Sequence, residues 1–285
     1  MMALFIVYIG QYPWYFPYFL HSCRHNPTVD FLIFTDNQTP LKHLPPNVHL
    51  IPCSIEQFKA NAFSALGFEV AVESGYKLCD FKPAYGYIFK DYIQDYDFWG
   101  YCDIDVIFGN IRDFMTNELL NEYDIISARH DYLTGCFALY RNNSLMRELF
   151  KQSKGYQKVF TDPRNFFFDE TNFAFEAFEK GLHYSQIPTE VESMTHVVRR
   201  LQNFPENEYG ILRGVVSNIS LVPVQAGEMA YYSVEIRLAD HLITTYKKEL
   251  PWLPNMQGQA DIITEDISLL ERLVLPVKKI LKESM

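Results

Sequence analysis

Two aspartates separated by a single residue follow a run of apolar and aromatic residues. They are Asp103 and Asp105 in the stretch WGYCDIDV, residues 99–106. Two carboxylates this close repel each other unless a cation lies between them or one of them takes up a proton. Proteins bind Mg²⁺ or Mn²⁺ through one or two carboxylates together with substrate phosphates. Asp103 and Asp105 are therefore predicted metal ligands, and a solvated turn is the alternative for an isolated DxD sequence.

The composition limits which partners the chain can have. The 285 residues carry 25 Lys and Arg against 35 Asp and Glu, a net charge of −10. Nonspecific binding to nucleic acid depends on neutralising phosphates, so we expect no nucleic-acid partner. The five cysteines are widely separated and odd in number, which indicates reduced thiols and a cytoplasmic protein. The apolar start MMALFIVYIG lacks leading basic residues and predicts a first strand, not a secretion signal.

Buried strands alternate with helical stretches along the first 180 residues. Apolar runs predict strands at residues 5–9, 30–36, 48–52, 97–102, 123–128 and 136–140, and helices are expected at 14–25, 54–66, 80–93, 144–153 and 170–180. This alternation is typical of an α/β fold with a mixed, mostly parallel central sheet. We expect one domain over residues 1–255 and a C-terminal helical extension over 256–285.

The DxD stretch is one of several landmarks that occur in a recognisable order. They are VYIGQYPWYFPYFLHSC, DFLIFTD, YKLCDFKPAYGYIF, DFWGYCDIDVIFGNI, LTGCFALYRN and FFFDETNF, between about residues 6 and 173. Together they resemble GT-A glycosyltransferases, in particular bacterial enzymes of capsule or lipopolysaccharide assembly. The resemblance implies a Rossmann-like GT-A domain that transfers a sugar from a nucleotide diphosphate, with Mn²⁺ or Mg²⁺ as cofactor. A nucleotide-sugar donor, above all a UDP-sugar, and a saccharide or lipid-linked saccharide acceptor are the implied partners.

The same resemblance implies donor-binding residues at the ends of strands and beside the DxD segment. Each has a structural alternative, such as Asp36 capping a strand or Asp80 capping a helix. We expect the donor to contact Tyr8, Ile9, Gly10, Asp36, Asp80, Lys82, Asp103, Gly135 and Lys248. No GxxxxGK[ST] loop and no GxGxxG sequence occurs, so a P-loop or dinucleotide enzyme is not indicated.

An acidic pair follows three aromatic residues in FFFDET, residues 166–171. Asp169 and Glu170 at a helix start can simply favour the helix dipole. Carboxyl groups beside aromatic walls also tend to have a raised pKa, which suits a general base. We expect Asp169 or Glu170 to be the catalytic residue that faces the acceptor.

A third metal ligand is expected from the C-terminal region. The stretch His241 to Trp252 contains a His, two Lys and a Pro-Trp pair, as the corresponding segment of related GT-A enzymes does, but with longer spacing and no glycine. His241 is the predicted ligand, and Lys248 or Lys247 would meet the leaving phosphate. His130 and His196 are the alternatives.

Two questions stay open at the level of sequence. The tail LVLPVKKILK, residues 273–282, mixes apolar and Lys positions, so it is either a packed helix or a peripheral contact with the inner face of the membrane. A nucleotidyltransferase and a non-catalytic carbohydrate-binding protein are the alternative functions. The first usually has a Gly-rich basic loop after the first strand, where this chain has Gly10 to Trp14.

Overall fold

The computed structural model describes residues 1–41, 43–201, 211–220, 224–226, 229–238 and 241–250. The chain divides into two compact units, residues 1–203 and 204–285. The sequence led us to expect a division at residue 255 instead. The residues around that position, the predicted extension over 256–285 and the tail at 273–282 lie outside the described residues.

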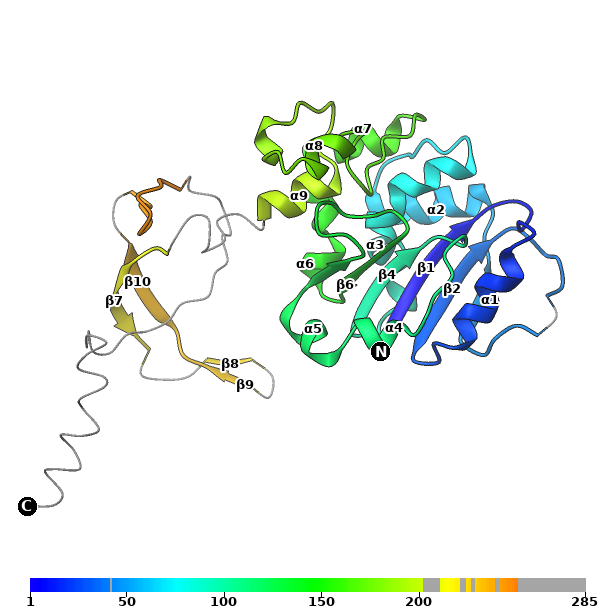
Figure 1. The fold of residues 1–285 in the computed structure, drawn as a ribbon, viewed down its shortest axis with the longest axis horizontal. Helices are drawn as coiled ribbons and strands as arrows, with labels where there is room; N and C mark the ends of the chain where they lie inside the picture. Colours follow the sequence, from blue (N-terminus) through cyan, green and yellow to red (C-terminus); the bar gives the residue numbers. More distant parts are fainter. Residues whose placement is uncertain (42, 202–210, 221–223, 227–228, 239–240, 251–285) are drawn as a thin grey trace, which may run out of the picture. The chain divides into compact units, whose positions relative to one another are not determined.

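A six-stranded sheet forms the centre of the first unit (Figure 1). Its strands, in the order β3-β2-β1-β4-β6-β5, are β3 (Val48–Pro52), β2 (Val29–Thr35), β1 (Met2–Tyr8), β4 (Phe98–Cys102), β6 (Phe137–Arg141) and β5 (Ile125–Ser127). The first four are parallel, whereas β6 pairs antiparallel with both β4 and β5. The prediction of an α/β fold with a mixed, mostly parallel sheet is therefore confirmed.

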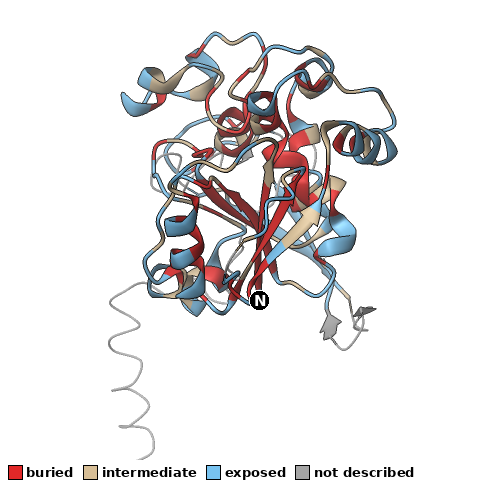
Figure 2. Ribbon diagram, turned by 90° about the vertical axis from the view of Figure 1, so that its right-hand side faces the viewer, coloured by how far each residue is buried: buried red, intermediate tan, exposed pale blue. Residues whose placement is uncertain are grey.

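Alternation along the strands produces two hydrophobic cores, one on each face of the sheet. In β1, Leu4 and Ile6 belong to one core, and Ala3 and Phe5 belong to the other. The first core is covered by α1 (Phe16–Arg24), α4 (Ile111–Phe114) and α5 (Asn117–Glu122). Figure 2 shows the inner strands of this sheet as mostly buried, as strands covered on both faces must be, whereas the edge strand β3 is partly exposed.

The opposite core is covered by a larger set of short helices. They are α2 (Ile55–Leu66), the 3₁₀ helix η1 (Gly75–Ala84), α3 (Tyr85–Ile88), α6 (Ser144–Arg147), η3 (Leu149–Gln152), α7 (Tyr156–Thr161) and α9 (Met194–Leu201). Three further short helices, η2 (Lys90–Tyr92), α8 (Phe175–Glu179) and η4 (Tyr184–Gln186), supply no buried member of this core. Helix α2 begins with a capping box, in which the side chains of Ser54 and Gln57 each bond the other's backbone N–H.

Three helix predictions need correction, and one helix was not predicted. The helix expected over 144–153 divides into the short α6 and the 3₁₀ helix η3. The stretch 80–93 is mostly 3₁₀ and only briefly α-helical, and Pro83 lies inside η1, where it removes a backbone donor. The helix expected over 170–180 begins only at Phe175, after a turn. Helix α9 was not predicted, although Met194, Val197 and Val198 have helical spacing.

The second unit contains two pairs of antiparallel strands among its described residues. One pair is β7 (Gly214–Ile219) with β10 (Val234–Leu238), and the other is β8 (Val224–Ala226) with β9 (Met229–Tyr231). Across the described parts of both units, no helix is long and apolar enough to cross a membrane. All five cysteines are free thiols, as the sequence indicated.

Candidate active site

The order of the strands produces a topological switch point between β1 and β4. From β1 the chain proceeds through β2 and β3 on one side, and it reaches β4 on the other side of β1. In open α/β sheets, ligands bind beyond the carboxyl ends of the strands at such a switch point. Tyr8 ends β1 and Cys102 ends β4, so the residues that follow them lie at this switch point.

On the β1 side, the backbone of Gly10 is fixed to the end of β2. The Gly10 N–H donates to Asp36 Oδ1 at 2.7 Å, and Asn37 Nδ2 donates to the Gly10 carbonyl at 3.0 Å. Gly10 has a φ of 107°, which favours glycine. Tyr8, Ile9 and Gly10 are partly exposed, Asp36 is exposed, and the hydroxyl of Tyr8 donates to the carbonyl of Gln11. These four predicted donor residues therefore lie together at the end of β1 and β2.

On the β4 side, the paired aspartates differ in their surroundings. Ile104 between them is buried in the core, whereas Asp105 is exposed and has no hydrogen-bond partner among the described residues. The Asp103 side chain is 37% exposed, and its Oδ1 accepts a hydrogen bond from Lys82 Nζ at 2.7 Å. Asp103 Oδ2 and both oxygens of Asp105 remain available to a ligand.

Lys82 joins the DxD segment to the acidic pair. Its ammonium donates to Asp103 Oδ1 and to the carbonyl of Gly135 at 2.8 Å, and it lies 3.5 Å from Asp169 Oδ2. The Lys82 side chain is only 7% exposed. Burial opposes its charge, but the carboxylates of Asp169 and Asp103 help to raise the pKa of Lys82 well above its ordinary value. Lys82 is thus a fixed cation between two carboxylates that are far apart in sequence.

Gly135 lies two residues before the start of β6 and contacts the acidic pair. Its N–H donates to Glu170 Oε1 at 2.8 Å. A Cβ atom at this position would lie 2.5 Å from Asp169 Oδ2 and 3.3 Å from Glu170 Oε1. Only glycine allows both carboxylates to approach the backbone this closely.

The structure therefore brings together Lys82, Asp103, Gly135, Asp169 and Glu170, all of which the sequence singled out. Burial raises the pKa of Asp169 to about 7, Lys82 opposes the increase, and Glu170 adds to it. A carboxyl group with a pKa near neutrality can exchange a proton with a bound hydroxyl group. Glu170 is less buried than Asp169 and is more accessible to a ligand.

A strained turn carries the acidic pair. Phe167, Asn172 and Phe173 have φ values of 48°, 53° and 66°. Such conformations cost bulky residues free energy, on the order of 1–3 kcal/mol each, and occur preferentially at functional sites. Asp80 holds this turn, because its carboxylate accepts the backbone N–H groups of Phe166 and Phe168 at 2.9 Å.

Asp80 itself is fully buried and ion-paired. Lys77 Nζ donates to Asp80 Oδ2 at 2.8 Å and to the carbonyls of Val159 and Arg164 at 2.6 Å each. Burial raises the pKa of Asp80 and lowers the pKa of Lys77, while their mutual attraction opposes both changes. The geometry gives Asp80 a positioning role for the turn and makes Lys77 the ion-pair partner that holds Asp80 in place.

A metal ion at Asp103 and Asp105 would need ligands from a bound substrate. Among the described residues, no three His, Cys, Asp or Glu side chains are grouped to hold a metal ion. Mg²⁺ and Mn²⁺ are nevertheless held in many nucleotide-binding sites by one or two carboxylates plus phosphate oxygens. The free oxygens of Asp103 and Asp105 fit that pattern.

The predicted residues His241 and Lys248 belong to the second unit. The His241 ring lies 3.1 Å from Glu249 Oε1, and both side chains are exposed. Their part in the site stays a prediction. Of the alternatives, His196 is buried with Ser193 Oγ 2.8 Å from its Nδ1, and His130 lies beside a separate hollow.

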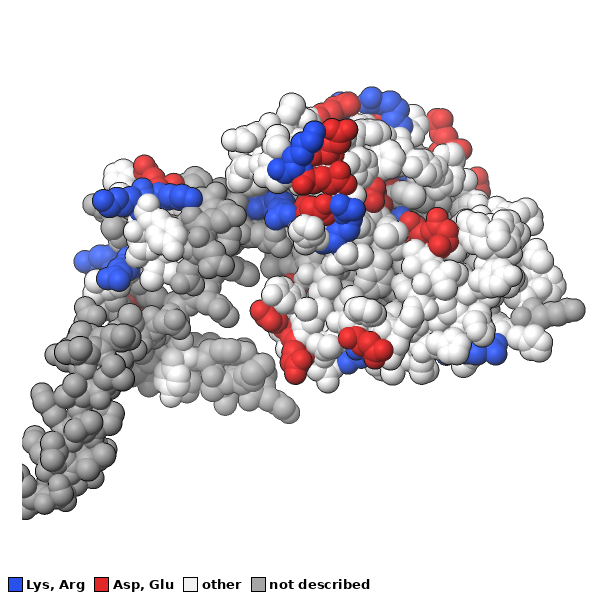
Figure 3. Space-filling model, viewed as in Figure 1, with Lys and Arg blue, Asp and Glu red and all other residues white. Residues whose placement is uncertain are grey.

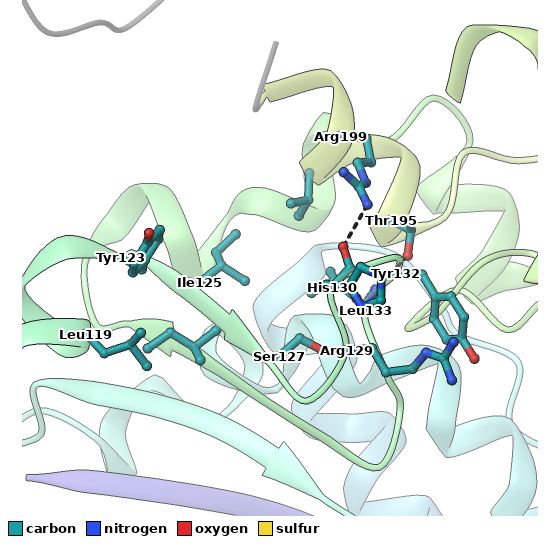
Figure 4. A pocket seen from close by; sticks show the side chains of 12 residues that line it. Leu119, Tyr123, Ile125, Ser127, Arg129, His130, Tyr132, Leu133, Thr195 and Arg199 are labelled. Carbon is teal, nitrogen blue, oxygen red and sulfur yellow. Dashed lines mark hydrogen bonds between the residues drawn. The ribbon is translucent and has the colours of Figure 1, made fainter. Parts of the chain in front are cut away.

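That hollow has a volume of about 270 Å³ and lies between β5, residues 129–133 and α9 (Figure 4). Apolar side chains form much of its lining, and Arg199 crosses it to donate to the carbonyl of His130 at 2.9 Å. Thr195 connects this region to the acidic pair, because its N–H donates to the carbonyl of Glu170 and its hydroxyl accepts the N–H of Leu133.

On the face seen in Figure 3, most of the described Lys and Arg side chains lie near Asp and Glu and form no extended basic patch. Among the described residues, several cations are paired, for example Lys158 and Arg164 with Glu190. On this face, a phosphate-bearing ligand would therefore depend on local groups.

Some residues of the site could not be recognised in the sequence. Tyr76 and Phe173 are exposed aromatic residues. Their rings contact that of Phe167, which precedes the acidic pair by two residues. The chain contains 23 Phe and 19 Tyr, so no sequence signal distinguished them. In the aromatic run at residues 14–19, Phe16 and Phe19 are buried but Trp14 and Tyr18 are exposed.

Comparison with known proteins places the chain in one family. A model of the DUF6625 family, described as a family of unknown function, matches residues 4–230, and the chain belongs to this family. No curated protein and no solved structure matches the chain.

Proposed function

We propose that the protein is a metal-dependent glycosyltransferase that moves a sugar from a nucleotide-diphosphate sugar, in particular a UDP-sugar, to an acceptor hydroxyl group. The acceptor is a saccharide or a lipid-linked saccharide of a bacterial surface polysaccharide. One observation carries the proposal. Asp103 and Asp105 follow β4 at the switch point of the sheet, and Lys82 connects Asp103 to the buried Asp169.

Each group at the switch point has a role in this reaction. Asp103 and Asp105 hold Mn²⁺ or Mg²⁺ with the donor diphosphate, and the cation supplies positive charge for the leaving group. Asp36 and the backbone at Tyr8, Ile9 and Gly10 contact the nucleoside. Asp169 or Glu170 accepts the proton of the acceptor hydroxyl group, and a general base contributes about 10²–10⁴-fold in rate.

Lys82 neutralises part of the negative charge at this site. Its ammonium lies between Asp103 and Asp169 and so reduces the repulsion between the two carboxylates. It also favours the ionised form of Asp169 and thereby keeps a base available near neutral pH.

A thermal-shift screen of UDP-, GDP-, CMP- and dTDP-sugars, each with and without Mn²⁺, tests the proposal. A ligand that binds only the folded protein raises its apparent stability by mass action. We expect an increase with one class of donor, present with Mn²⁺ and absent with EDTA, and slow donor hydrolysis under the same conditions. The absence of any nucleotide-dependent shift would contradict the proposal, and a shift without hydrolysis would favour a non-catalytic binding protein.

A further inference from the structure

Three aromatic rings near the acidic pair are not part of either hydrophobic core. Tyr76 is 60% exposed and Phe173 is 62% exposed. Phe167 lies between them, with its ring centroid 6.2 Å from that of Tyr76 and 4.8 Å from that of Phe173. We call Tyr76, Phe167 and Phe173 the aromatic platform.

The backbone holds this platform open at a cost. Phe167 and Phe173 both adopt the left-handed conformation, which bulky residues rarely do. Phe166 and Phe168, on either side of Phe167, are buried and fixed by Asp80. In a core residue, the free energy gained by burying the side chain can offset the cost of a strained backbone. The side chain of Phe173 is exposed and gains no such free energy, but a ligand that covers its ring would bury it.

Charge selects the kind of ligand that fits. Burial is the main cause that raises the pKa of Tyr76, but the carboxylates of Asp169 and Glu170 contribute, so the platform lies within their field. The nearby cation, Lys82, is occupied by Asp103, Gly135 and Asp169. An anionic ligand would be repelled here, whereas a neutral ligand rich in hydroxyl groups would donate hydrogen bonds to Glu170.

We propose that the aromatic platform binds a neutral pyranose ring of the acceptor, with one face of the ring on Tyr76 and Phe173 and a hydroxyl group directed at Glu170. A binding site that combines apolar aromatic walls with a few placed polar groups has the composition expected for such a ligand. This proposal rests on the proposed function and specifies its acceptor. It makes the site unsuitable for an acidic sugar or a free phosphate.

The test compares Tyr76→Ala and Phe173→Ala with the matched control Phe114→Ala. Phe114 is 73% exposed and lies on α4, on the opposite face of the sheet. Binding of lactose, cellobiose and maltose to the full chain is followed by saturation-transfer NMR, and binding of UDP with Mn²⁺ is followed by calorimetry. We expect at least one disaccharide to bind the wild-type chain and each platform variant to weaken that binding about fivefold to tenfold. Phe114→Ala should change neither measurement.

The outcomes separate this proposal from the proposed function. If no disaccharide binds the wild-type chain, or if Phe114→Ala weakens binding as much as the platform variants do, the platform is not a saccharide site. If the platform variants instead lose UDP, the rings stack on the nucleotide base and the proposal is wrong. If disaccharides bind the platform but UDP with Mn²⁺ does not bind the chain, the platform stands and the transferase function fails.

Discussion

Asp169 is buried beside the Lys82 cation, and these two features have opposite effects on its pKa. Its pKa is raised to about 7 by burial, and Lys82 opposes that increase. If Asp169 acts as a base, donor hydrolysis should increase as pH rises through about 7 and then level off. Asp169→Asn should remove this rise. Lys82→Met removes the cation that lowers the pKa, so the rise should move to higher pH. A pH profile that is the same in all three proteins would exclude Asp169 as the base and leave Glu170.

The same shift predicts how stability depends on pH. Between about pH 4 and pH 7 the folded protein keeps the Asp169 proton, whereas the unfolded chain has lost it. The folded state then binds more protons, so the contribution of Asp169 to the free energy of unfolding falls as pH rises through this range. The stability of Asp169→Asn relative to the wild-type protein, measured by urea unfolding, should therefore increase as pH rises from about 4 to 7.

Gly135 packs directly against the carboxylates of the acidic pair. A Cβ atom there would meet the carboxylate of Asp169, so Gly135→Ala must displace either the start of β6 or the acidic pair. We expect a loss of stability of about 1–3 kcal/mol, as for other overpacked positions, and a larger relative loss of turnover. Gly109→Ala is the matched control, because a Cβ atom there has no neighbour within 4 Å. Equal effects of the two substitutions on turnover would show that the close contact at Gly135 has no functional importance.

At the scale of elements, the buried pair of Lys77 and Asp80 fixes the turn that carries the catalytic acids. Asp80→Asn leaves the Lys77 charge buried without its partner, which typically costs about 3–5 kcal/mol. We expect a clear decrease in the urea midpoint. The double variant Lys77→Met/Asp80→Asn has no buried charge and should recover part of this loss. If the double variant is no more stable than Asp80→Asn, the unpaired charge is not the cause.

Some elements of the structure could be predicted from the sequence and others could not. Strands β1 to β4 were predicted because continuous apolar runs mark strands buried on both faces, and Asp103 and Asp105 were predicted because they follow one of them. The turn at 167–173 was not predicted, because Phe167 and Phe173 adopt left-handed conformations that their residue type disfavours. Lys82 was assigned to the donor, but its contacts with Asp103, Gly135 and Asp169 join distant segments and depend on the tertiary fold.

At the scale of the whole molecule, both hydrophobic cores of the described residues lie in the first unit. Their buried members, as far as the structure describes the chain, all precede residue 204. We expect a fragment of residues 1–203 to unfold cooperatively in urea. It lacks His241 and Lys248, so it should bind UDP with Mn²⁺ more weakly than the full chain does, and His241→Ala in the full chain should weaken binding in the same direction. Equal affinity in all three proteins would exclude His241 as a metal ligand.

The central claim is that the carboxyl end of β4 binds a nucleotide diphosphate through a divalent cation. Calorimetric titration of UDP into Asp105→Asn with Mn²⁺ tests it most directly, because an amide supplies no negative charge to the cation. Asp95→Asn is the control, since Asp95 is an exposed acid before the amino end of the same strand. We expect the wild-type protein and Asp95→Asn to bind UDP only with Mn²⁺, and Asp105→Asn to lose that binding while its thermal unfolding is unchanged. Wild-type affinity in Asp105→Asn would contradict the account.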